Sequence, residues 1–279
     1  MSDNWIIETL QKAFDNWNDK LVEIWALLTE TPETFHGGAI WTTVVNINDS
    51  LKAIGYGLLV LFFAMSIFKS AASFRDFQRP EFALRHFLRF AAAKVAVGYA
   101  MDLMTTIFSI CGGIVQTIMS GVGGMAAASV TVPQEITDAV ENVGFVQSIP
   151  LWIVSVLGSL FITVMSFILI MTVYGRFFRI YLYTALAPIP LASFAGEETS
   201  ASGRAFLKSY TGVCMEGAVI VLACMIFSAF ASGGTPIVDT NLTPVTMMWQ
   251  YIVQCVFNML VLVSLIRGAD RIVKDMFGL

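Results

Sequence analysis

The feature that most constrains this chain is a series of apolar runs long enough to cross a lipid bilayer, with basic residues confined to alternate linkers between them. A membrane-spanning helix needs about 20 mostly apolar residues. Hydrophobic residues make up 57% of the 279 residues, and charged residues only 13%. A soluble domain of this composition would have to expose much of its apolar surface. The sequence therefore predicts an all-α membrane protein.

The apolar runs predict five transmembrane helices, at about 54–68, 87–110, 151–174, 210–231 and 249–266. A further apolar stretch, 180–194, is short, and Pro188 and Pro190 interrupt any continuous helix within it. Such a stretch is typical of a re-entrant segment that enters the membrane and returns on the same side. The sequence thus predicts a separate N-terminal helix in residues 1–35 and a polytopic transmembrane domain in residues 36–279.

The basic residues predict the orientation of the chain. The linkers 69–89, 175–209 and 267–279 hold 5, 4 and 3 Lys or Arg residues, whereas 111–148 and 232–248 hold none. Cytoplasmic linkers carry an excess of Lys and Arg. We therefore expect the C-terminus in the cytoplasm and the N-terminal helix outside.

A heptad-like apolar stripe marks the N-terminal segment. Its residues recur at alternating steps of three and four, and they are Ile7, Leu10, Phe14, Trp17, Leu21, Ile24 and Leu28. Charged residues fill the positions between them, and Thr31-Pro32 ends the pattern. Two interpretations remain open: a helix that lies flat on the membrane surface, or a helix whose stripe packs on a neighbouring copy or a partner.

Three ionisable residues fall inside the predicted spans, namely Lys94, Asp102 and Glu216. Charged groups in a membrane are costly and often functional. Lys94 and Glu216 lie at comparable depths, so they are candidates for a pair between two helices. One interpretation of the three residues is a polar pathway or proton relay. The alternative, which we favour, is a pair that fixes helix packing, with Asp102 in a water-filled vestibule.

No catalytic pattern accompanies these charges. The sequence has no HExxH motif and no Ser/His/Asp arrangement, and His36 and His86 are isolated. The four cysteines occur in apolar segments without CxxC spacing, as buried small residues do. We therefore expect no enzymatic activity, no catalytic residue, no bound cofactor and no metal site.

One stretch of the chain is typical of a known family. The segment YGRFFRIYLYTALAPIPLASF is apolar and proline-broken, and a short polar loop leads from it into the next span, FLKSYTGVCMEGAVIVL. Together with the acidic N-terminal helix, five crossings and a long third linker outside, it resembles the TrbL-type polytopic inner-membrane component of type IV secretion and conjugation machines. The resemblance covers most of the chain.

This resemblance implies a role and partners. Several copies would assemble as a homo-oligomer in a bacterial inner membrane, around the axis of the machine, and DNA or protein would be a passing substrate. Other secretion-machine subunits would bind them, including an extracytoplasmic stalk or fibre subunit. The N-terminal stripe would then be the oligomer or stalk contact, and the re-entrant segment would face cytoplasmic ATPases.

Two other functions remain open. One is a stand-alone transporter or channel that uses the charges of Lys94, Asp102 and Glu216. No inverted repeat supports it, and only one segment is broken, where transporters often have a symmetric pair. The other is a membrane anchor or assembly factor for a different complex. We favour the translocation-platform subunit.

Overall fold

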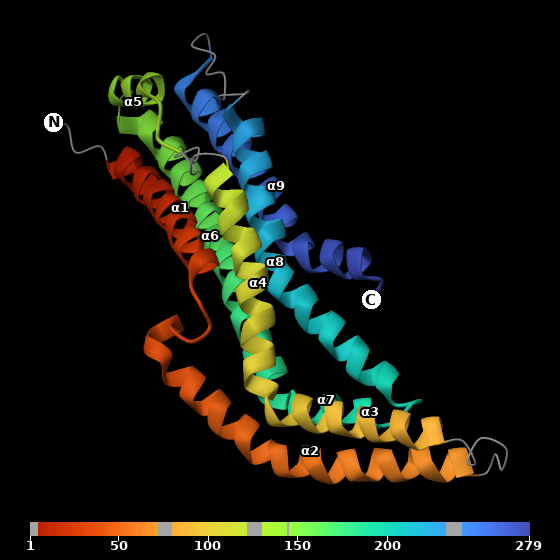
Figure 1. The fold of residues 1–279 in the computed structure, drawn as a ribbon. Coiled ribbons are helices and arrows are strands. Elements are labelled where there is room, and N and C mark those ends of the chain that lie inside the picture. The colour runs from red at the N-terminus through yellow and green to blue at the C-terminus, as the bar shows by residue number, and fades with distance from the viewer. Residues whose placement is uncertain (1–4, 72–79, 122–129, 144, 233–241) are drawn as a thin grey trace. The chain divides into compact units, whose positions relative to one another are not determined.

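The structure is a computed structural model that describes residues 5–71, 80–121, 130–143, 145–232 and 242–279. Helices make up the regular structure of these residues, which contain no strand (Figure 1). The helices are α1 (Trp5–Thr29), α2 (Ala39–Ala71), α3 (Pro80–Gly98), α4 (Ala100–Gly121), α5 (Gln134–Glu141), α6 (Phe145–Leu186), α7 (Pro188–Ala192), α8 (Ser200–Ser232) and α9 (Pro244–Phe277), with the 3-10 turns η1 (Phe35–Gly38) and η2 (Ser193–Ala195). The predicted all-α class is confirmed.

Among the described residues, five helical segments are long and apolar enough to cross a membrane. They are Phe35–Lys69, Ala100–Gly121, Ser148–Leu186, Ser200–Phe230 and Pro244–Phe277. The large side chains that they expose in the isolated chain are mostly apolar, as lipid-facing side chains are. The chain is a multi-pass membrane protein.

The predicted span at 87–110 is not one straight helix. The chain turns at Gly98 and Tyr99, where α3 ends and α4 begins, and α4 leaves α3 at a steep angle (Figure 1). The helical hydrogen bond from Tyr99 N to the Val95 carbonyl persists at 2.9 Å. A Cβ at Gly98 would lie 3.1 Å from the Tyr56 hydroxyl. Because Gly98 has no side chain, it leaves room for the Tyr56 side chain of α2 at the bend.

The helices form two compact units. Unit 1 contains Met1–Thr29, Gln116–Tyr174 and Val219–Ala269, and unit 2 contains Glu30–Val115, Gly175–Ala218 and Asp270–Leu279. This division differs from the predicted separation of residues 1–35 from 36–279. The reason is that α1 packs into unit 1.

In unit 1, α1 runs parallel to α6, and hydrogen bonds join the two helices near the start and near the end of α1 (Figure 1). The Ser155 hydroxyl donates to the Ile6 carbonyl at 2.8 Å, near the start of α1. The Tyr174 hydroxyl donates to Glu23 Oε1 at 2.8 Å, near its end. These contacts place α1 beside the span that the sequence predicts at 151–174.

The apolar stripe of α1 therefore packs on its own chain. Ile7 is half-buried, and the other six stripe residues are buried: Leu10, Phe14, Trp17, Leu21, Ile24 and Leu28. The Phe14 ring also meets the edge of the Tyr251 ring of α9, with 6.1 Å between centroids. The chain's own helices therefore cover this stripe, so it is not exposed for the predicted oligomer or stalk contact. The placement of α1 on a membrane surface stays a prediction. An amphipathic stripe signals burial against a partner, and here the partner is intramolecular.

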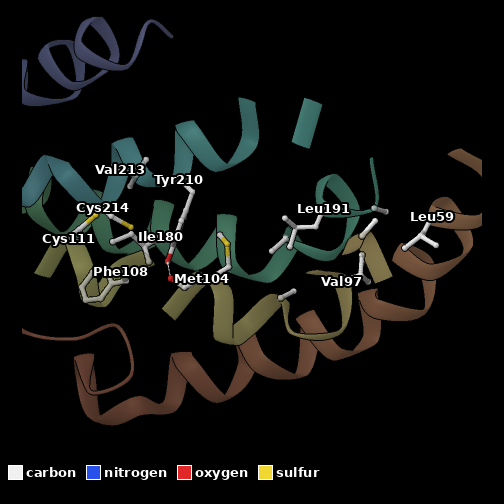
Figure 2. Packing of buried hydrophobic residues seen from close by; sticks show 14 of the residues in the cluster. Leu59, Val97, Met104, Phe108, Cys111, Ile180, Leu191, Tyr210, Val213 and Cys214 are labelled. Carbon is white, nitrogen blue, oxygen red and sulfur yellow. Dashed lines mark hydrogen bonds between the residues drawn. The ribbon is translucent and has the colours of Figure 1, made fainter. Parts of the chain in front are cut away.

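In unit 2, α2, α3 and α7 lie side by side (Figure 1). Buried apolar residues of α2, α3, α4, α6, α7 and α8 form one cluster (Figure 2). Within it, the Tyr210 hydroxyl donates to the Met104 carbonyl at 2.9 Å, which ties α8 to α4. Burial of this cluster holds α7 and the segment after it against α2 and α3.

Candidate functional site

The proline break is the first part of the candidate site. Residues 180–186 continue α6 as ordinary helix, so only the second half of the predicted re-entrant segment departs from it. α6 ends at Leu186, and α7 begins at Pro188, which contributes no backbone N–H. The predicted break at Pro188 and Pro190 is thus present as a turn followed by the short helix α7.

Because Pro188 lacks an N–H, the Thr184 carbonyl loses its helical donor, and a side chain of α2 binds it. In a continuous helix the Thr184 carbonyl would accept from the backbone N–H of residue 188, which proline lacks. Instead, Asn48 Nδ2 donates to the Thr184 carbonyl at 2.7 Å, beside a longer bond of 3.4 Å from the Ala187 N–H. The Asn48 side chain is fully buried. Buried backbone carbonyls need such a donor, so Asn48 stabilises the break from a helix more than 130 residues away in sequence.

Replacing Asn48 by leucine is expected to lower stability by about 1–3 kcal/mol, because the Thr184 carbonyl then loses its short hydrogen bond in a buried site. The Asn48 Oδ1 has no hydrogen-bond partner in the described part of the chain, which offsets part of the loss. The measurement is the thermal unfolding midpoint of the purified protein in mild detergent. Asn46→Leu, at an exposed position of the same helix, is the matched control. Equal midpoints for the two variants would contradict this role for Asn48.

Glycines let α2 approach the break closely. A Cβ at Gly55 would lie 2.8 Å from the Pro188 carbonyl oxygen, closer than a carbon normally approaches. Further along, a Cβ at Gly196 would lie 3.1 Å from the Phe62 carbonyl oxygen. The Thr199 hydroxyl would be nearer still to this Cβ at Gly196, at 2.5 Å, but the Pro188 and Phe62 oxygens belong to the backbone and cannot swing aside. α2 therefore packs backbone to backbone against α7 and against the start of the following loop.

Two ion pairs hold the loop that follows η2. Arg89 of α3 contacts Glu197 at 3.0 Å, and Lys69 of α2 pairs with Glu198. The hydrogen bond and the positive charge of Arg89 lower the pKa of the Glu197 carboxyl. Both pairs are largely exposed, so they contribute little stability. Their effect is to fix the loop against α3 and against the last turn of α2.

A charge network is the second part of the candidate site. Arg179 of α6 contacts Glu216 of α8 at 2.6 Å and Asp270 of α9 at 3.0 Å. Lys274 also contacts Asp270, at 2.8 Å. The Glu216 side chain is only 3% exposed, so its charge depends on Arg179 for compensation. One arginine thus joins three helices of unit 2.

Arg176 lies one helical turn before Arg179 and is fully buried. Its guanidinium donates to the carbonyls of Val213 and Cys214, at 3.3 and 3.1 Å. A Cβ at Gly217 would lie 2.8 Å from the Arg176 Cζ. Gly217 therefore leaves the space in which a guanidinium reaches the backbone of α8.

These contacts revise the predicted charge pair. Glu216 binds Arg179 in place of Lys94, which is exposed on α3. Asp102 is also exposed, in the first turn of α4, where a carboxylate interacts favourably with the helix dipole. Within the described ranges no ion pair or side-chain hydrogen bond joins the three residues. A functional pathway through them stays a prediction.

Sequence reasoning missed Arg176, Arg179 and Asn48 as site residues. The sequence predicts both arginines in a linker, because the predicted span before them ends at about residue 174. The apolar residues that follow them, up to Leu186, could have indicated that the helix continues past both arginines. Asn48 gave no signal in the sequence, since its role depends on a proline far along the chain.

The cysteines fit the sequence prediction. Cys111, Cys214, Cys224 and Cys255 are free and buried. In the part of the chain that the structure describes, no group of three or more His, Cys, Asp or Glu residues is arranged to hold a metal ion.

Comparison with known proteins adds one finding. A family model described as "TrbL/VirB6 plasmid conjugal transfer like protein" matches residues 17–188, from within α1 to the proline that begins α7. The match covers more than half of the chain and includes the whole of α2, α3 and α6. No curated protein and no solved structure matches the chain.

Proposed function

Because this chain belongs to the TrbL/VirB6 plasmid conjugal transfer-like family, we propose that it is a multi-copy platform subunit in the inner membrane of a type IV secretion or conjugation machine. The family makes it a component of such a machine, which it forms with other subunits. The finer proposal is that several copies support assembly of the channel or stalk and passage of the DNA or protein substrate. The family match over residues 17–188 carries this conclusion.

The internal contacts favour a platform over a stand-alone transporter. A relay needs ionisable groups that exchange protons along a path. Here the buried carboxylate of Glu216 is neutralised by Arg179, and Arg176 binds helix carbonyls. Such contacts lock α6, α8 and the end of α9 into one arrangement. A rigid scaffold with an apolar exterior suits a subunit around which other components assemble.

The proposed orientation follows the basic linkers. It places the N-terminus outside and the C-terminus in the cytoplasm, because Lys and Arg concentrate in 69–89, 175–209 and 267–279. Residues 72–79 of the first linker lie outside the described part of the chain. The loop with Glu197 and Glu198 is then cytoplasmic, and we assign it, with Lys69 of α2 and Arg89 of α3, to the contact with cytoplasmic ATPases. A stalk or fibre subunit would bind the opposite side, through surfaces other than the buried stripe of α1.

Deleting the gene in the native host tests this proposal. We expect transfer of conjugal DNA, or secretion of the protein substrate, to fall to background and to return when the wild-type chain is supplied in trans. Immunoblots for the remaining machine subunits serve as the control for indirect loss. Normal transfer in the deletion strain would overturn the proposal.

A further inference from the structure

The first half of the outward face of α1 is polar, whereas the exposed face of the neighbouring α6 is apolar. Its exposed residues again follow steps of three and four, and they are Trp5, Glu8, Lys12, Asp15, Asp19, Val22, Ala26 and Thr29. The four residues that follow Trp5 on this face are all charged. Glu8, Asp15 and Asp19 carry carboxylates, and Lys12 carries an ammonium group. The side chains of Lys12 and Glu8 pair with each other at 2.5 Å and remain more than half exposed.

Hydrogen bonds set the register between α1 and α6. The Ser155 hydroxyl binds the Ile6 carbonyl, the Ser159 hydroxyl binds the Thr9 carbonyl at 3.2 Å, and Tyr174 binds Glu23. From Ile6 to Glu23 an α-helix advances about 25 Å, close to the roughly 30 Å thickness of a bilayer's hydrocarbon core. α1 therefore accompanies α6 over most of the length of a membrane crossing.

The exposed side chains of α6 beside α1 indicate whether this part of the unit faces water or lipid. The segment Ser148–Leu186 is the most apolar of the five candidate spans. Its large exposed residues between the two end contacts with α1 are all apolar: Val156, Leu157, Leu160, Phe161, Val164, Phe167 and Met171. Exposed apolar side chains of this kind are typical of a lipid-facing surface. If they lie in lipid, then Lys12, Asp15 and Asp19 lie at the same depth, because they fall between the same contacts.

A charged side chain that faces lipid at this depth is unfavourable by several kcal/mol, so such residues almost always face protein or a water-filled cavity. We propose that α1 lies at bilayer depth beside α6 and that its acidic outward face borders a water-filled space from which neighbouring copies exclude lipid. This inference rests on the proposed function, because the surrounding copies provide the enclosure. It gives the machine a hydrated surface inside the membrane, lined by carboxylates.

Cysteine labelling in membranes that contain the assembled machine tests the proposal. Single cysteines replace Lys12, Asp15 or Asp19 on α1, and the matched controls are Leu160→Cys and Phe167→Cys on the exposed face of α6. A membrane-impermeant maleimide is added to open membrane fragments. We expect the α1 cysteines to react at least about tenfold faster, because a hydrated thiol ionises and an apolar surrounding suppresses the thiolate. The wild-type chain, whose four cysteines are buried, gives the background.

A second measurement confirms that α1 is docked while it is labelled. The pairs Thr9→Cys/Ser159→Cys and Glu23→Cys/Tyr174→Cys are treated with a short bismaleimide, and both pairs should crosslink within one chain. Slow labelling of all three α1 positions would overturn the inference, as would equally fast labelling of Leu160→Cys and Phe167→Cys. Fast α1 labelling without either crosslink would also overturn it, because α1 would then lie apart from α6. Any of these results together with normal substrate transfer would reject the inference and leave the proposed function standing.

Discussion

Replacing Gly55 by valine is expected to destabilise unit 2 strongly, with a loss of about 3 kcal/mol or more, at the upper end of what overpacking costs. The new Cβ would lie 2.8 Å from the Pro188 carbonyl oxygen and 3.1 Å from Val97 Cγ1. Because one of these atoms is backbone, α2 has to move away from α7. That movement also separates Asn48 from the Thr184 carbonyl.

Gly57→Val is the matched control for this prediction. Gly57 lies two residues further along α2, and a Cβ there meets nothing within 4 Å. Both variants change the same residue type in the same helix, so helix propensity affects them about equally. The measurements are the amount of protein in membranes and the unfolding midpoint in mild detergent. If Gly55→Val were as stable as Gly57→Val, the close packing of α2 on the proline break would be wrong.

The second large effect is expected at Arg179. Replacing Arg179 by methionine leaves the buried Glu216 carboxylate without its cation, and removal of one partner of a buried pair costs about 3–5 kcal/mol. The double variant Arg179→Met/Glu216→Met should recover most of this loss, because it removes the stranded charge as well. Unfolding midpoints of the single and double variants provide the comparison.

Arg204→Met is the control for loss of a basic residue without a buried partner, since Arg204 is exposed on α8. It should be close to the wild-type chain in stability. A double variant that is less stable than Arg179→Met would show that Glu216 does not depend on Arg179, contrary to the contact at 2.6 Å.

The sequence predicted the features that depend on composition over many residues. Runs of about 20 apolar residues identified the multi-pass all-α class. The absence of a backbone N–H at Pro188 was sufficient to place the break near residue 188. The family resemblance, given by the stretch around that break, agrees with the family match over residues 17–188.

Features that depend on which surfaces meet were not predictable from the same patterns. The stripe of α1 showed that a partner exists but not that the partner is α6, because Ser155 and Ser159 look like ordinary small residues of a span. The bend at Gly98 depends on the approach of Tyr56, and glycine alone is common in straight membrane helices. Glu216 was recognised as a costly buried charge, but its partner required the helix to continue past Arg179.

The mass of the crosslinked complex, purified from native membranes in mild detergent, tests the platform role most directly. The account predicts a complex that contains several copies of this chain, with secretion ATPases or other machine subunits co-purifying. A crosslinked monomer or dimer without any such subunit would contradict it.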